Sequence, residues 1–181
     1  MTRRGIETSP DQIKAILELE SPTSAKQLQM LTGRAAALNR FISRRSDKCK
    51  SFFRLVMKAT DFLWTEECKV ALADLKKYLT MAPVLLNPEP REELFLYLVV
   101  SEHAVSSVII REEIGKLRAV FYVSKTLAEA KTRYLPLEKL TQALVMASKK
   151  LNHYFQAHKI VVLTEHPLNI SSLTQCIEVC I

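Results

Sequence analysis

The sequence predicts an α+β chain, in which a helical first half is followed by a mixed α/β sheet with a packed helix. Apolar residues recur at helical spacing within residues 9–80, whereas short apolar runs of strand length follow from residue 94. A proline-containing extended connector within residues 81–90 separates the two patterns. Only 3 glycines occur among 181 residues, which argues against glycine-rich phosphate loops and against an all-β fold with many tight turns.

Three helix starts can be recognised in the first half. Ser9 and Ser24 are each followed three residues later by glutamine, which is the pattern of a capping box, and Pro10 suits the first helical position. Thr65 opens a third helix, whose first turn carries two glutamates at the positive end of the helix dipole. We therefore expect helices to begin at these three places, each burying one apolar stripe.

The second half contains short runs that are typical of strands, and Gly115 marks the turn between two of them. A long helix is expected from about residue 136 to residue 155, because apolar side chains recur there at helical spacing. The expected strands cover residues 94–100, 105–111, 117–123 and 159–163. Three strands in a meander, then a helix, then a further strand predict an α/β core.

The net charge of +7 is concentrated in one stretch of the chain. Residues 34–58 contain eight basic side chains and one acid, Asp47, so this stretch carries the whole net charge. Such a stretch can bind a phosphate backbone through counterion release, but a solvated helix face followed by a basic loop is an equally open interpretation. The candidate nucleic-acid-binding residues are Arg34, Arg40, Arg44, Arg45, Lys48 and Lys50.

Several classes of protein are excluded by composition. The first residues include no apolar segment of a secretory signal, and no apolar run approaches the roughly 18 residues that a membrane helix needs. The 4 cysteines form no Cys-x-x-Cys pair, so neither a zinc site nor a disulfide framework is expected. These features favour an intracellular protein without a membrane partner, and they leave cytoplasm and nucleus open.

Several segments, in order along the chain, carry motifs that occur together in one family. They are Gly5–Glu7 with Pro10–Ile16, Leu31–Arg34 with Asn39–Ile42, Phe62–Cys68 with Leu75–Lys76, Tyr122–Leu127, Tyr134–Lys139 and Leu163–Leu168. This series resembles the pol polyproteins of gypsy-type LTR retrotransposons. The earlier segments resemble the thumb of the reverse transcriptase and its link to RNase H, and the last three resemble the RNase H-like part.

The resemblance covers about residues 3–168 and implies a domain organisation. Residues 1–82 would form a helical thumb and connection segment of a reverse transcriptase. Residues 91–168 would form a degenerate RNase H-like domain, truncated at its C-terminal side, and residues 169–181 would be a divergent tail. A truncated core of this kind predicts an exposed sheet edge and marginal stability.

The resemblance also implies which catalytic groups the chain lacks. A reverse transcriptase polymerises at a Tyr-x-Asp-Asp turn that holds two Mg²⁺ ions, and this sequence has no such turn. RNase H members carry a first aspartate where this chain has Val99. The second carboxylate survives as Glu138, and the third appears as the longer Glu165. Because Val99 cannot bind a metal, these three are vestigial positions, and polymerase and RNase H activities are not expected of this chain.

Two interpretations of the remaining carboxylates stay in play. Glu138 is either a metal ligand or an exposed acid in the first turn of a helix, and Glu102 could replace the missing ligand only if a bulge or turn reoriented it. No resident metal or cofactor is therefore expected, and Mg²⁺ would be needed only for residual RNase H activity.

The leading hypothesis is a non-catalytic structural connection domain of a retrotransposon reverse transcriptase–RNase H polyprotein. Its partners would be the remainder of the pol polyprotein and an RNA–DNA hybrid or another nucleic-acid duplex. The alternatives are a sequence-independent nucleic-acid-binding module and an active ribonuclease H-type endonuclease.

Overall fold

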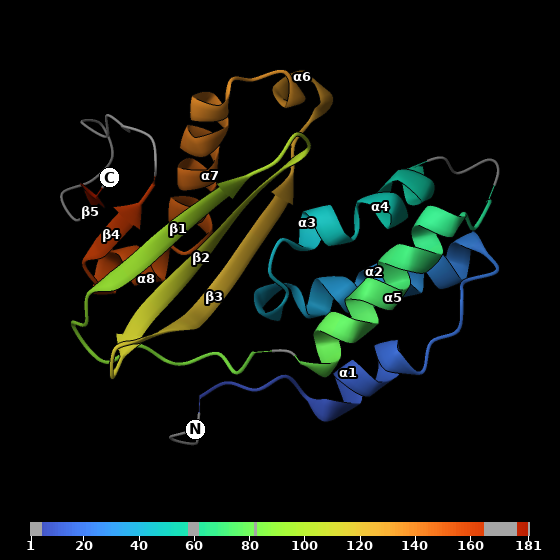
Figure 1. Ribbon diagram of the computed structural model, residues 1–181, viewed down its shortest axis with the longest axis horizontal. Helices are drawn as coiled ribbons and strands as arrows, with labels where there is room; N and C mark the ends of the chain where they lie inside the picture. The colour runs from blue at the N-terminus through green and yellow to red at the C-terminus, as the bar shows by residue number, and fades with distance from the viewer. Residues whose placement is uncertain (1–4, 58–61, 82, 165–176, 181) are drawn as a thin grey trace.

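The computed structural model describes residues 5–57, 62–81, 83–164 and 177–180. Figure 1 shows a group of helices, built by the first half of the chain, beside a sheet with helices packed against it. We call these two parts the helical lobe and the sheet lobe. The arrangement confirms the predicted fold class, in which a helical segment precedes a mixed sheet with a packed helix.

The helical lobe has an apolar core of its own. Its elements are α1 (Pro10–Leu17), α2 (Ala25–Ala37), the short 3₁₀ helix η1 (Asn39–Phe41), α3 (Arg45–Lys48), α4 (Lys50–Met57) and α5 (Glu66–Thr80). The apolar stripes of α1, α2, α4 and α5 meet, because burial of these stripes stabilises helices that are too short to persist alone in water. The buried core residues include Ile16, Leu28, Leu31, Ala35, Phe52, Leu72, Leu75 and Leu79.

The helix starts lie where the sequence predicts them, but the caps differ in detail. Thr65 and Ser24 each accept a hydrogen bond from a backbone N–H in the first turn of their helix. The side chain of Gln27 accepts from the backbone of Thr23 rather than from that of Ser24. Ser9 makes no side-chain cap bond, so the capping box predicted there is wrong.

The sheet has five strands in the order β3-β2-β1-β4-β5. Strands β3, β2 and β1 form an antiparallel meander, and β4 and β5 extend it in parallel from β1. The strands are β1 (Leu94–Val100), β2 (Ala104–Glu113), β3 (Lys116–Thr126), β4 (Ile160–Leu163) and β5 (Ile177–Cys180).

Strand β5 comes from the segment predicted as a divergent tail. Its backbone pairs with β4 in parallel, with Ile160 opposite Ile177. Strand β4 is therefore an inner strand of the sheet, and β5 lies at its edge. This strand is hard to predict from the sequence, because it has only four residues and follows no element with a recognisable apolar period.

A helical segment follows β3 along the chain, and its longest helix packs against β1 and β2 (Figure 1). It contains α6 (Glu129–Thr132), α7 (Pro136–Lys150) and α8 (Asn152–Ala157). The single helix predicted for residues 136–155 is interrupted at Leu151, which leaves the helical region with φ −114° and ψ 23°. Leu151 is fully buried, and it and Phe155 both belong to the core of the sheet lobe. None of the helices in the described ranges combines the length and apolar character needed to cross a membrane.

The two lobes are joined by hydrogen bonds between α3 and the sheet. Ser124 Oγ accepts from the backbone N–H of Ser46 at 3.0 Å and shares a hydrogen bond with Ser106 Oγ at 2.9 Å. Ser101 Oγ donates to Asp47 Oδ1 at 2.6 Å. The first two of these hydrogen bonds join Ser46, Ser106 and Ser124, which are all buried. Each bond therefore also satisfies a polar group that would be costly to leave unpaired. We call these five residues the interlobe latch.

The connector between the lobes forms backbone hydrogen bonds with the N-terminal segment and with the sheet. Ile6 and Leu85 form an isolated antiparallel bridge, with hydrogen bonds of 2.6 and 3.1 Å. The next residue, Leu86, donates its N–H to the carbonyl of Ala119 on β3 at 3.0 Å. Gly5 precedes this bridge with φ +94°, and a Cβ there would lie 2.4 Å from the carbonyl oxygen of Leu85, so only glycine fits.

The thiol of Cys49, between α3 and α4, gives the folded state a predictable pH dependence. Cys49 is fully buried, and burial raises the pKa of its thiol from 9.0 to about 11. The thiol therefore stays protonated to a higher pH in the folded state than in the unfolded chain. The contribution of this thiol to the free energy of unfolding is fully present below pH 9. As the pH rises from 9 to 11, the free energy of unfolding falls by about 2–3 kcal/mol.

We expect urea unfolding of the wild-type protein to lose this amount between pH 8 and pH 11, relative to Cys49→Ala. The substitution also leaves a cavity, but its cost does not depend on pH, so the difference between the two proteins isolates the thiol. Parallel stability curves over this range would contradict the prediction.

Candidate nucleic-acid interface

Some side chains of the predicted basic stretch make contacts inside the protein instead of facing solvent. Arg34 Nη1 donates to the carbonyl of Ala15 at 2.6 Å, which ties α2 to α1. The guanidinium of Arg40 lies 5.3 Å from the ring centroid of Phe41 and 5.2 Å from that of Phe121, on β3. Both arginines thus contribute to packing, and Arg40 does so between the lobes.

Lys48 is also directed inward. Its Nζ donates to the carbonyl and to Oγ of Ser43, at 2.9 and 3.2 Å, and lies 4.6 Å from the ring centroid of Tyr78. Burial lowers the pKa of Lys48, and the neighbouring charge of Arg44 lowers it further. A partly buried ammonium with these partners is a weaker phosphate contact than an exposed one.

The other predicted cations lie closer to the surface. Arg44 is half-exposed and forms an ion pair with Asp47, with Nε 3.1 Å from Oδ2. Arg45 Nε donates to Asn39 Oδ1 at 2.9 Å, which fixes its direction. Lys50, at the start of α4, is partly exposed and lines a cleft. Of the six predicted residues, two therefore line a depression in the surface, Arg45 and Lys50, whereas Arg44 is exposed beside it and the other three have internal roles.

That depression consists of three adjoining clefts that meet at Thr126, the last residue of β3. Their volumes are about 530, 340 and 470 Å³. The first and second clefts share Lys125 and Lys150, the first and third share Phe53, and the second and third share Leu127. We call the combined depression the Thr126 groove. It runs between α3 and α4 of the helical lobe and β3, α6 and α7 of the sheet lobe.

The groove is strongly basic. No aspartate or glutamate is present among the described residues that line it, and cations come from five separate elements. A concave surface lined by one sign of charge concentrates the field and attracts polyanions. The lining cations are Arg45, Lys50, Arg54, Lys125, Lys131, Lys149 and Lys150.

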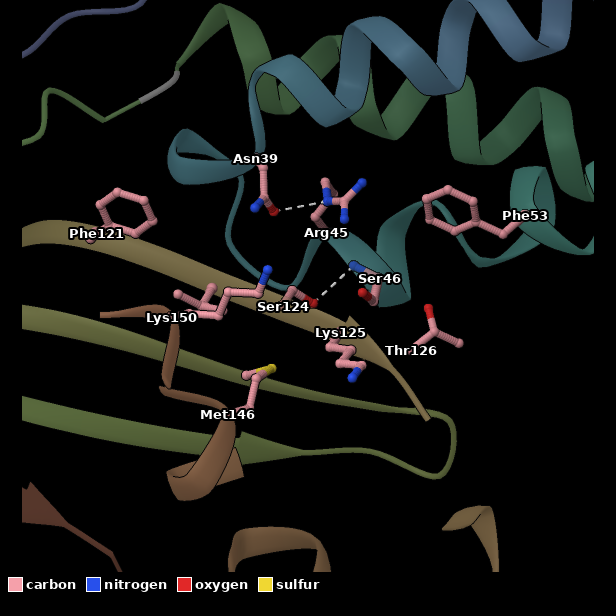
Figure 2. Close-up of a pocket in the computed structure, with 11 residues that line it drawn as sticks. Asn39, Arg45, Ser46, Phe53, Phe121, Ser124, Lys125, Thr126, Met146 and Lys150 are labelled. Atoms are coloured by element: carbon pink, nitrogen blue, oxygen red, sulfur yellow. Dashed lines mark hydrogen bonds between the residues drawn. The ribbon is translucent and has the colours of Figure 1, made fainter. Parts of the chain in front are cut away.

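The interlobe latch holds the two sides of the groove in place. Figure 2 shows Arg45 on the side of the helical lobe and Lys150 on the side of α7, with Ser124 between them. The hydrogen bonds from Arg45 to Asn39 and from Ser46 to Ser124 appear there as dashed lines. Because the Ser46 bond crosses from one lobe to the other, the separation of the cations is set by the fold.

Sequence reasoning missed the cations that come from the sheet lobe. Lys149 and Lys150 end α7, where they face the negative end of the helix dipole, and Lys125 lies at the end of β3. They are far from residues 34–58 in the chain, so a search for a basic run cannot find them. The only feature of the sequence that these lysines share is a position at the end of an expected helix or strand.

The vestigial RNase H positions do not meet in a metal site that the structure describes. Val99 lies near the end of β1, opposite Ser106 of β2, and 37% of its surface is exposed. Glu138 Oε2 accepts a hydrogen bond from the N–H of Leu135 at 2.9 Å, so this carboxylate caps α7. Glu165 lies outside the described residues.

The surroundings of Glu102 do not fit a divalent cation either. Its side chain is 88% exposed and pairs with His103 at 3.4 Å. The ammonium of Lys139, a buried residue, donates to the backbone carbonyl of Glu102 at 3.2 Å and places a positive charge beside the β1–β2 turn. Mg²⁺ requires several oxygen ligands in near-octahedral geometry, and the described residues here supply neither the number nor the charge. Within the described ranges, no group of three His, Cys, Asp or Glu side chains is placed to hold a metal.

Known sequences place the chain in a family. Residues 64–162 match the model of an RNase H-like domain found in reverse transcriptase. The chain is 25% identical over 178 residues to a retrovirus-related Pol polyprotein from transposon opus of Drosophila melanogaster, with 92% of the chain covered. It is 24% identical over 168 residues to that from transposon 297 of the same organism, also with 92% covered. The chain spans only 18% and 15% of the length of these two relatives.

Solved structures agree on the fold. The foamy viral protease-reverse transcriptase in complex with double-stranded DNA matches 96% of this chain and 41% of its own, with a TM-score of 0.78 and 19% identity. The same protein in complex with an RNA/DNA hybrid matches 93% of this chain and 23% of its own, with a TM-score of 0.78 and 22% identity. The matched model covers more than half of the chain, including α5, β1 to β3 and α7. The protein therefore belongs to the family of RNase H-like domains found in reverse transcriptase.

Proposed function

We propose that this chain is a non-catalytic connection domain of a retrotransposon reverse transcriptase–RNase H polyprotein, and that it contacts a nucleic-acid duplex through the Thr126 groove. The observation that carries the proposal is the basic groove itself, which is built jointly by both lobes and lined by no described carboxylate. A surface with that charge and without metal ligands suits binding of a phosphate backbone rather than its hydrolysis.

Three features support the lack of catalysis. Val99 has an apolar side chain where the resemblance implies the first metal-binding carboxylate. Glu138 is engaged as the cap of α7 at 2.9 Å. Lys139, the next residue, brings an ammonium to the turn that follows Val99 and Val100. A cation at this place repels Mg²⁺, so the local electrostatics oppose two-metal chemistry as well.

Backbone contact is supported by the exposure of the groove cations. Lys125, Lys149 and Lys150 are exposed, and within the described part of the chain no hydrogen bond or ion pair directs them into the protein. Such ammonium groups can neutralise phosphates and release condensed counterions, which gives sequence-independent binding. Structural relatives have been solved with double-stranded DNA and with an RNA/DNA hybrid, which makes a duplex the natural first ligand to test. The remainder of the polyprotein is the other partner that we propose.

The proposal is tested with a labelled RNA–DNA hybrid in Mg²⁺ and, separately, in Mn²⁺. We expect no cleavage above the level of the buffer. A gel shift on the same hybrid should detect binding that weakens about 100-fold between 50 and 200 mM salt, if about four phosphates are contacted.

Two results would overturn the proposal in different ways. Cleavage that Glu138→Gln abolishes would identify an active ribonuclease H-type endonuclease with a rebuilt metal site. Absence of binding at 50 mM salt would remove nucleic-acid contact and leave a domain that serves only to connect its neighbours.

A further inference from the structure

We propose that one end of the Thr126 groove admits a single-stranded nucleic-acid segment, whose bases contact apolar side chains of α4 while its phosphates contact the cations beside them. This end is the third cleft, between α4 and the β3–α6 connection, and we call it the α4 cleft. The inference rests on the proposed function, because it specifies the strand state of the ligand at one end of the same groove.

The side chains of α4 alternate in chemistry along one helix face. Lys50, Phe53, Arg54 and Met57 are spaced i, i+3, i+4 and i+7, so they lie together, and all four line the cleft. The opposite face carries the buried Phe52. The exposed face is therefore an interleaved row of two cations and two apolar side chains, and a single strand presents phosphates and bases in the same alternation.

The size of the α4 cleft selects for a single strand. Its volume is about 470 Å³, within the usual range of pockets for small ligands. A nucleotide can enter a space of this size, whereas a double helix can only lie across its mouth. Cations at the mouth would serve both ligands, but apolar side chains in the cleft contribute only to a ligand that brings bases inside.

Apolar groups in the cleft are accessible to such bases. The Met57 side chain is 86% exposed, and its polarisable thioether suits contact with an aromatic ring. Phe53 is half-buried, with the guanidinium of Arg45 5.5 Å from its ring centroid. Leu127 completes the apolar lining from the side of the sheet lobe. Contact through these apolar groups is expected to tolerate any sequence, because every base presents a π-face to them.

The test compares two fluorescent oligomers with the same number of phosphates, oligothymidylate and an abasic chain, by anisotropy at low salt. We expect the full chain to bind oligothymidylate about 10-fold more tightly than the abasic oligomer, because each base in contact with an aromatic or apolar side chain adds affinity. Binding of an RNA–DNA hybrid is measured in parallel on the same protein.

Met57→Ser gives the decisive variant, since Met57 is exposed and the change does not disturb the core. It should lower the affinity for oligothymidylate about 3-fold or more and leave the affinity for the abasic oligomer and the hybrid unchanged. Met81→Ser is the matched control, because Met81 is 72% exposed at the end of α5 and lines none of the three clefts. It should change none of the three affinities.

Failure of this inference is distinct from failure of the proposed function. Equal affinities for oligothymidylate and the abasic oligomer, with the hybrid still bound, would overturn the single-strand site and leave backbone contact intact. An equal loss in Met57→Ser and Met81→Ser would also overturn it. Absence of binding to all three ligands would overturn the proposed function itself.

Discussion

Replacing Lys125, Lys149 and Lys150 with alanine should weaken binding of an RNA–DNA hybrid about 100-fold at low salt, because three exposed cations would be removed from one groove. Each lost phosphate contact also removes about 0.9 from the slope of log K against log salt, so the slope should fall by about 3 units. The measurement is a salt titration of affinity by anisotropy or gel shift. Thermal unfolding should change little, since all three side chains are exposed.

A matched control separates position from total charge. Lys26, Lys116 and Arg118 are also exposed, and they lie on α2 and at the far end of β3, outside the three clefts. Their triple alanine variant loses the same three charges. If binding depends on the groove, this control keeps most of its salt slope. Equal losses in the two variants would mean that the protein attracts nucleic acid only through its net charge.

Phe52→Ala should destabilise the protein by about 3–5 kcal/mol, which is the usual cost of removing a fully buried aromatic side chain. Phe52 is 0% exposed in the core of the helical lobe. Its ring stacks on Trp64, with centroids 5.8 Å apart and planes inclined by 10°. Trp64 is the single tryptophan of the chain, so its fluorescence during urea unfolding reports directly on this contact.

Phe52→Leu provides the comparison for this core substitution. It keeps an apolar side chain and leaves a smaller cavity, so it should cost distinctly less than Phe52→Ala. A loss below about 1 kcal/mol for the alanine variant would mean that the core of the helical lobe contributes little to the global unfolding reaction.

The regular elements could be predicted because their signals are local. The strand expected for residues 94–100 is β1 with the same bounds, and those expected for 105–111 and 117–123 fall within β2 and β3. The single helix expected for residues 136–155 is broken at Leu151, although this side chain keeps the buried position that the apolar periodicity predicts. Strand β5 forms because β4 offers it a partner, and pairing with a distant strand leaves little mark on four residues.

The candidate site was less predictable, because a linear run of charge says nothing of where each side chain points. Arg34 and Lys48 belong to the basic stretch, yet the guanidinium of Arg34 and the ammonium of Lys48 donate to backbone carbonyls inside the helical lobe. Lys125 and Lys150 lie far from that stretch and come to the groove only through the fold. Glu138 is the opposite case, since a local rule about acids in the first turn of a helix anticipates its capping role.

The pairing of Ile6 with Leu85 has a mechanical consequence. Tension applied along the chain at Gly5 reaches the hydrogen bonds of the Ile6–Leu85 bridge first, and from Leu86 it passes to Ala119 at the outer edge of the sheet. The load path therefore enters the sheet lobe directly and bypasses the helices that lie between these segments in sequence. A movement of whatever precedes Gly5 in a longer polypeptide would be transmitted to β3, and hence to the strand on which the Thr126 groove is built.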